Sequence, residues 1–277
     1  MQPLIKNAGL RIFLYCLGFI IVAIFFTIPF IPFIEYSSLS FSNEMVVMGI
    51  FTNFIPFIFL TYLFTRFIDR QSFESLGFKC KGFGYDFMHG SFLGIMLIFI
   101  GIVLMILSGG TEFTNQMHLN FSYLLIGAFG FFLFAWIEEI IFRGYILKNL
   151  LAYNKYVALI ISSLLFAVVH LGNASMGILP IINLFIAGIL LGYYYIYKQN
   201  LWFPTGLHFT WNYFQGHIFG FEISGHPVDS IFNQTINEAY PNYITGGNFG
   251  FEGSLFCTAI MLLAIVYIDI CYRPKSK

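Results

Sequence analysis

Long apolar runs separated by short polar connections dominate this chain of 277 residues. An α-helix rises about 1.5 Å per residue and the hydrocarbon core of a bilayer is about 30 Å thick, so one crossing needs about 20 apolar residues. The runs that meet or approach this length are Ile12 to Phe33, Met45 to Phe64, Tyr85 to Leu107, Phe121 to Leu147, Tyr156 to Leu171, Gly177 to Tyr197, Leu201 to Phe219 and Ser254 to Tyr272. The pattern predicts an all-α fold, a polytopic transmembrane helical bundle of about eight spans.

The composition supports a membrane protein and excludes an ordinary soluble domain. Hydrophobic residues make up 58% of the chain and charged residues only 9%, whereas soluble domains carry about 25% charged residues. No internal repeat, linker or low-complexity tract divides the sequence, so we expect a single membrane-embedded domain over residues 1–277. The formal net charge is zero, and the expected surroundings are the lipid bilayer, with no nucleic acid as a partner.

The distribution of charge predicts the topology. With eight spans, all 13 Lys and Arg residues fall on one side of the bundle or toward that side of a span. Because cytoplasmic loops carry an excess of Lys and Arg, both termini are predicted to be cytoplasmic. The charged residues of the opposite loops are all acidic: Glu35, Glu44, Glu112, Glu222, Asp229, Glu238 and Glu252.

One of these opposite loops, residues 220–253, is long and rich in Gly, Asn, Tyr and Phe. Loops of this length are uncommon without a role, so this segment could act as a lid over the bundle. Composition alone favours the simpler interpretation of a glycine-rich surface loop outside the lipid.

Polar side chains that a purely structural helix does not need occur inside three of the predicted spans. A charge near the bilayer centre costs about 2.5 to 3.5 kcal/mol per residue on insertion scales, so such residues persist mainly where they face a cavity and have a function. The residues are Glu138, Glu139 and Arg143 in one span, His170 in the next, and His208 and Asn212 in a third.

Helical spacing predicts which of these side chains can meet. Glu139 and Arg143 are four residues apart, so they share one helix face, and Glu138 points about 100° away from Glu139. Glu138 and His208 each lie ten residues from the lysine at the inner end of their span, which places both about 15 Å above that end in one shared layer. His170 lies fifteen residues from its inner lysine, or about 22 Å, and is expected to sit higher.

These residue types suit the hydrolysis of an amide bond, because a carboxylate can serve as a general base, a histidine can donate or orient a proton, and an asparagine amide can stabilise an oxyanion. Simpler structural roles stand beside this interpretation. Glu139 and Arg143 could form a salt bridge that ties two helices, and His170 or His208 could make an interhelical hydrogen bond. For Asn183, which has no charged companion, interhelical hydrogen bonding is the preferred interpretation.

Other polar residues give weaker signals. Asp86 and Asp269 could imitate the two aspartates of an intramembrane aspartyl protease, but both fall at inner helix ends. The H-E-x-x-H zinc motif and the G-x-S-x-G nucleophile motif are absent from the sequence. Four histidines at span ends or in loops are expected to be ordinary interfacial residues: His89, His118, His217 and His226.

An ordered set of three motifs lies on the three polar spans. The motifs are Glu138-Glu139-x-x-x-Arg143, Phe166-x-x-x-His170 and His208-x-x-x-Asn212. In this order they resemble the CAAX protease and bacteriocin-processing (CPBP) family of intramembrane proteases, which includes the Abi and Rce1-like proteins. The core resemblance covers residues 127–216, and weaker similarity extends to residues 75–78 and 245–253.

The resemblance implies an endopeptidase in which Glu138 activates water together with His170, while His208 and Asn212 stabilise the oxyanion. Glu139 and Arg143, the remaining motif residues, would support this site. The mechanism that the resemblance implies depends on the glutamate, although the family is often labelled as metalloproteases.

A metal is therefore left open. If one is present, Glu138, His170 and His208 would hold it, and zinc is the candidate because two histidines and a carboxylate leave a position for water. No other cofactor is expected.

The expected substrate is a membrane-associated or lipidated peptide or protein, and whether it is prenylated is left open. Short loops without large extra domains resemble the bacterial branch of the family, which implies a multi-pass protein of the bacterial plasma membrane. The alternative is a catalytically silent membrane protein of the same fold that binds a partner or confers immunity, and that would keep its effect without Glu138.

Overall fold

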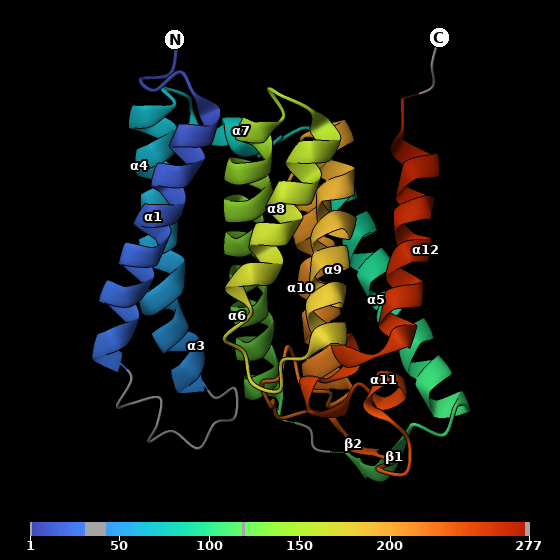
Figure 1. The fold of residues 1–277 in the computed structure, drawn as a ribbon. Helices are drawn as coiled ribbons and strands as arrows, with labels where there is room; N and C mark the ends of the chain where they lie inside the picture. Colours follow the sequence, from blue (N-terminus) through green and yellow to red (C-terminus); the bar gives the residue numbers. More distant parts are fainter. Residues whose placement is uncertain (1, 31–42, 118–119, 275–277) are drawn as a thin grey trace.

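The computed structural model describes residues 2–30, 43–117 and 120–274, and helices dominate it (Figure 1). Within these described ranges, six helices are long and apolar enough to cross a membrane. They are α1 (Ala8–Thr27), a continuous helix over Val46–Ile68, α5 (Phe83–Leu107), a continuous helix over Phe121–Leu150, α9 (Ile178–Lys198) and α12 (Leu255–Tyr272). The predicted polytopic helical bundle is thus confirmed.

Two of the long helices are composite. The helix over Val46–Ile68 contains the end of α3 (Asn43–Gly49), the whole of α4 (Ile55–Leu63) and two wider π-type turns. The helix over Phe121–Leu150 begins as α6 (Phe121–Glu139), widens into a π-type segment over Ile140–Leu147, and ends as α7 (Lys148–Leu150).

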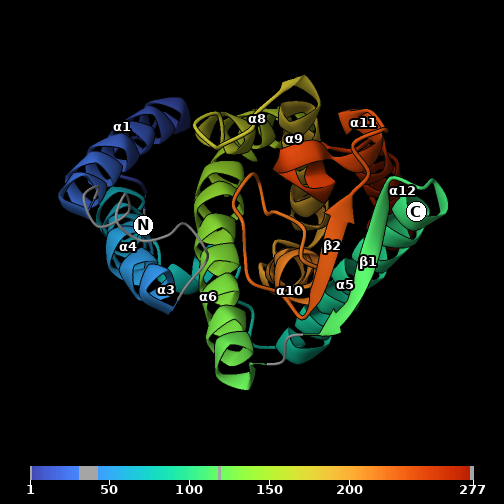
Figure 2. The ribbon, with the colours of Figure 1, turned by 90° about the horizontal axis from the view of Figure 1, so that it is seen from below.

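The remaining two predicted spans are shorter helices. The first, α8 (Lys155–Val169), has 15 residues, and the second, α10 (Trp202–Tyr213), has 12 residues before a π-type turn that ends at Ile218. Figure 2 shows α10 in the middle of the bundle, where protein rather than lipid surrounds it. The count of eight spans stays a prediction, because length and apolarity select only six.

A few predictions fall outside the described residues. These are the end of the first predicted span at Phe33, the acidic residue Glu35, the histidine His118 and the C-terminal lysines Lys275 and Lys277.

Polar side chains define where several helices begin. The side-chain oxygens of Asn7, Asn120 and Asn154 each accept a hydrogen bond from a backbone N–H in the first turn of α1, α6 and α8. Ser254 does the same for α12, where its Oγ accepts from the N–H of Cys257 at 3.1 Å. Such caps satisfy N–H groups that a helix leaves free at its start, so these short polar residues end the loops between apolar runs.

The connections gather at two opposite ends of the bundle (Figure 1). α1 begins and α12 ends at one of them. The other, here called the loop end, carries a small antiparallel sheet of β1 (Thr111–Met117) and β2 (Phe232–Ile236) and the short helix α11 (Asn242–Thr245). The segment 220–253, for which a lid and a surface loop were both considered, therefore contains regular structure.

Close contact between α5 and α10 holds the central helix in place. A Cβ atom on Gly90 of α5 would lie 2.0 Å from the carbonyl oxygen of Phe203, and one on Gly206 of α10 would lie 2.3 Å from that of Phe87. Only glycine permits so close an approach of two backbones, which is the usual way for small residues to pack helices in membranes. This packing fixes the position of His208, two residues after Gly206.

Candidate active site

A cavity of about 280 Å³ lies between α6, α8, α9, α10 and the loop end. Glu138 near the end of α6, His170 just after α8, and His208 and Asn212 on α10 all line it. The structure therefore brings the four residues predicted to be catalytic to one cavity, although they come from three helices. Most of the remaining wall consists of apolar side chains from these helices.

The two adjacent glutamates face different surroundings, as their helical spacing predicts. Glu138 lines the cavity and its side chain is 31% exposed, whereas Glu139 is fully buried. The π-type segment starts directly after Glu139 and contains Arg143. Wider turns of this kind occur often at functional sites, and here the segment directs Arg143 back toward Glu139.

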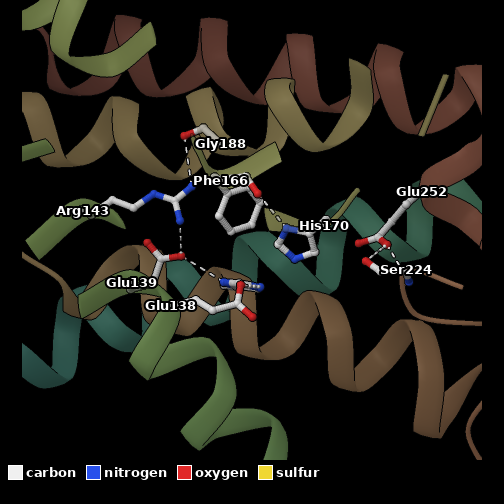
Figure 3. A network of polar contacts seen from close by, with 9 residues as sticks. Glu138, Glu139, Arg143, Phe166, His170, Gly188, Ser224 and Glu252 are labelled. Carbon is white, nitrogen blue, oxygen red and sulfur yellow. Dashed lines mark hydrogen bonds and ion pairs between the residues drawn. The ribbon is translucent and has the colours of Figure 1, made fainter. Parts of the chain in front are cut away.

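Glu139, Arg143 and His208 form one buried network (Figure 3). Arg143 Nη1 donates to Glu139 Oε1 at 2.8 Å, and His208 Nδ1 donates to the same oxygen at 2.9 Å. Arg143 Nη2 also donates to the carbonyl oxygen of Gly188 on α9 at 3.1 Å, and its guanidinium lies over the ring of Phe166 at 4.6 Å. The ion pair thus joins α6 to α8, α9 and α10, and it also fixes the ring of His208.

Glu138 meets the other side of the same imidazole. Its Oε2 lies 3.8 Å from His208 Nε2, which confirms that the two residues share a layer of the bundle. Within the described residues this oxygen has no hydrogen-bond partner. Glu138 therefore presents a carboxylate oxygen beside the cavity, next to an imidazole that a second glutamate holds in place.

His170 lies at the end of α8, with its orientation set by its own helix. Its Nδ1 lies 2.7 Å from the carbonyl oxygen of Phe166. A carbonyl oxygen can only accept, so Nδ1 carries the proton and Nε2 is the acceptor of the neutral ring. In the described part of the chain no hydrogen bond or ion pair joins His170 to Glu138, in line with the higher position that its spacing predicts.

The cavity contains four polar residues that were not among the predicted site residues. They are Asn173, Ser224, His226 and Glu252. His226 was expected to be an ordinary interfacial residue, and it is exposed, but it also reaches the cavity because the loop 220–253 folds back over the ends of the helices. The same expectation was wrong for His217, which is fully buried and donates from Nδ1 to the carbonyl oxygen of Asp229 at 2.8 Å. The signal available in the sequence was the weaker family similarity of residues 245–253, which includes Glu252.

Glu252 is the second carboxyl group of the cavity. Its Oε2 accepts hydrogen bonds from the backbone N–H of Ser224 at 2.9 Å and from Ser224 Oγ at 2.7 Å. Burial raises the pKa of the Glu252 carboxyl above its ordinary value, and the bonds from Ser224 and the neighbouring His170 only partly offset this. Burial also lowers the pKa of His226, helped by repulsion from His170.

The candidate metal ligands do not fit a metal ion in this arrangement. Glu138, His170 and His208 line the same cavity. Across the described residues, however, no three His, Cys, Asp or Glu side chains form a group that could hold a metal ion.

Together, the fold and the cavity define a multi-pass integral membrane protein with acidic and imidazole groups gathered inside its helical bundle. Residues 120–214, about a third of the chain, match the family model described as type II CAAX prenyl endopeptidase Rce1-like. The matched segment contains all three motifs, so it supports the resemblance to the CAAX protease and bacteriocin-processing family that they indicate. Comparison with curated proteins and with solved structures gave no match.

Proposed function

We propose that this protein is an intramembrane endopeptidase that hydrolyses a peptide bond in a membrane-associated or lipidated substrate, using water activated by Glu138. The observation that carries the proposal is the shared cavity of Glu138, His170, His208 and Asn212 inside a membrane-spanning bundle. The match of residues 120–214 to the model of a protease family supports a hydrolase over a purely structural role.

Glu138 and His170 activate the water molecule, because each has a hydrogen-bond acceptor at the cavity. Glu138 lines the cavity with a partly exposed carboxylate, and His170 offers Nε2. A water molecule that hydrogen-bonds to both is oriented toward a substrate carbonyl placed between them. Glu138 takes one proton from this water as its oxygen attacks the carbonyl carbon, and a tetrahedral oxyanion forms.

Oxyanion stabilisation falls to α10. His208 and Asn212 are four residues apart and both line the cavity, so their side chains lie on one face. An imidazolium at His208 has a carboxylate oxygen near each ring nitrogen, Glu139 at 2.9 Å and Glu138 at 3.8 Å. It can donate from Nε2 while Asn212 donates from its amide, and both act where charge develops.

Product release completes the proton balance. The carbon–nitrogen bond of the tetrahedral intermediate breaks, and the proton held by Glu138 passes to the leaving amine. The products are a carboxylic acid and an amine, and Glu138 returns to its ionised form. Glu139 does not touch the substrate in this scheme: it is a positioning residue that holds His208.

The finer features of the proposal concern the substrate and its membrane. The apolar wall of the cavity favours a hydrophobic peptide segment. Short connections without added domains favour a bacterial plasma-membrane protein over a eukaryotic one. Prenylation of the substrate is left to experiment.

The test uses purified protein in lipid nanodiscs with a set of internally quenched apolar peptides, each made with and without a prenylated cysteine. Glu138→Gln should lower cleavage by about 10²- to 10⁴-fold, the usual contribution of a general base. Asp86→Asn and Asp269→Asn serve as controls, since neither residue lines the cavity. Full activity of the Glu138→Gln protein would refute the proposed chemistry, and loss of activity only in the aspartate variants would indicate an aspartyl mechanism.

A further inference from the structure

Glu252 is placed in the cavity by a tightly wound turn. Residues 246–253 contain Gly246 and Gly250, whose φ angles of 81° and 87° are in the left-handed region that favours glycine. A Cβ atom on Gly250 would lie 1.9 Å from the carbonyl oxygen of Glu222. The turn is therefore pressed against the preceding loop, and its conformation depends on glycine.

Two further contacts fix Glu252 from opposite sides. Asn183 Nδ2 on α9 donates to the carbonyl oxygen of Glu252 at 2.7 Å, and Ser224 holds the carboxylate through both its N–H and its hydroxyl. Ser224 itself has a φ of 49°, an uncommon conformation for a residue with a side chain. The expected interhelical hydrogen bonding of Asn183 is confirmed, since Thr258 of α12 also donates to its Oδ1 at 2.6 Å.

The catalytic scheme makes no use of this carboxyl group. Burying a carboxylate is costly unless a charge or several donors compensate for it, and Ser224 supplies only two hydrogen bonds to one of its oxygens. No Lys or Arg side chain is among the described residues that line the cavity. The structure thus holds a fixed acidic group in the same cavity as the candidate catalytic residues, and the described part of that wall contains histidines but neither Lys nor Arg.

The electrostatic character of the loop end agrees with that of the cavity. The segments 108–120, 171–177 and 219–254 contain five acidic residues and neither Lys nor Arg. These acids are Glu112, Glu222, Asp229, Glu238 and Glu252. A surface of one sign attracts ligands of the opposite sign and repels others. An anionic group of a substrate, such as a terminal carboxylate, would find no basic side chain here.

We propose that Glu252 and Ser224 form a subsite that binds a cationic amine of the substrate, either a lysine side chain or a free amino terminus, and that the enzyme thereby selects positively charged peptides. The inference rests on the proposed protease function. An ammonium group would donate to the Glu252 carboxylate and to the remaining lone pairs of Ser224 Oγ, and would supply the charge that this wall lacks.

The experiment compares paired quenched peptides in nanodiscs. A single lysine is moved through an apolar peptide, and each lysine peptide is paired with one that has norleucine at the same place. In the wild-type protein at least one position should raise kcat/KM by about 10-fold or more for lysine over norleucine. Glu252→Gln should reduce this ratio to about 1. Glu252→Lys should reverse the charge preference, so that a peptide with glutamate at this position is cleaved better than the peptide with lysine.

Glu238→Gln is the matched control, because it removes the same charge from an exposed position of the loop end outside this cavity. It should keep the lysine preference. A ratio near 1 at every position in the wild-type protein, or an equal loss in the Glu238→Gln and Glu252→Gln proteins, would overturn the subsite. If the Glu252→Gln protein unfolds, Ser224→Ala gives the second test. It should lose part of the lysine preference, and an unchanged ratio of kcat/KM would overturn the subsite.

Binding separates this inference from the proposed function. Fluorescence anisotropy measures the affinity of the same peptide pairs for the Glu138→Gln protein, which should not cleave them. Tighter binding of the lysine peptide supports the subsite even if the wild-type protein cleaves nothing. Equal cleavage of both peptides by the wild-type protein would refute the subsite and leave the protease function standing.

Discussion

Removal of Arg143 should destabilise the protein through the charge that it leaves behind. The guanidinium donates to Glu139 at 2.8 Å and to the Gly188 carbonyl at 3.1 Å, and both charged side chains are fully buried. Arg143→Met keeps an apolar chain of similar length but leaves Glu139 without its cation. Loss of one partner of a buried pair costs about 3 to 5 kcal/mol, so a fall of this size in the free energy of unfolding is expected.

The double variant Glu139→Gln/Arg143→Met distinguishes charge from packing. Removing both charges eliminates the uncompensated carboxylate, and the glutamine oxygen can still accept from His208 Nδ1. The remaining deficit is the lost hydrogen bond to the Gly188 carbonyl, about 1 kcal/mol, and the lost contact with the Phe166 ring, about 0.5 to 2 kcal/mol. The double variant should therefore be more stable than Arg143→Met by about 2 kcal/mol, although still less stable than the wild type.

Unfolding can be followed by alkylation of Cys257, which is fully buried on α12, in a background where Cys16, Cys80 and Cys271 are replaced by serine. The protein is titrated with a denaturing detergent at about pH 8.5, near the ordinary cysteine pKa, so that Cys257 reacts readily with the alkylating reagent once unfolding exposes it. A double variant no more stable than Arg143→Met would refute the reasoning. Recovery of stability without recovery of peptide cleavage would assign Glu139 a positioning role beyond its structural one.

Three further predictions concern the packing of α10 and the cavity. Gly90→Ala should lower the free energy of unfolding by about 1 to 3 kcal/mol, because the added methyl group would collide with the Phe203 carbonyl. Gly84→Ala in the same helix is the control: its methyl group has no atom within 4 Å, so this variant should be as stable as the wild type or slightly more stable, and thermal unfolding in detergent compares the two. Asn183→Ala should raise KM for lysine peptides more than it lowers kcat, since it frees the backbone of Glu252; an effect confined to kcat would contradict this. Burial raises the pKa of Glu252, so on acidification this carboxylate takes up a proton at a higher pH than an ordinary glutamate does. The lysine preference should be lost with that protonation, and a preference that does not change as the pH is lowered would contradict the subsite.

The part of the site that could be predicted from sequence depends on regular helical geometry. A separation of four residues correctly predicted the contact of Glu139 with Arg143, and equal distances from the inner helix ends correctly predicted that Glu138 and His208 meet. Both predictions use only the rise and turn of an α-helix, which the membrane enforces over long apolar runs.

The part that could not be predicted depends on the path of a long loop. Glu252 and His226 reach the cavity because left-handed glycines such as Gly250 reverse the chain and because Asn183, far away in sequence, holds the turn. No periodic pattern reports such a path.

The shortness of α8 has a consequence for the lipid around it. Its 15 residues span about 22 Å, which is about 8 Å less than the hydrocarbon thickness. A membrane adapts to a short segment by thinning, so a dimple should form beside His170 on the face toward the loop end. Water can enter this depression without a separate channel, and the dimple shortens the path from the adjoining leaflet to the cavity that His170 lines.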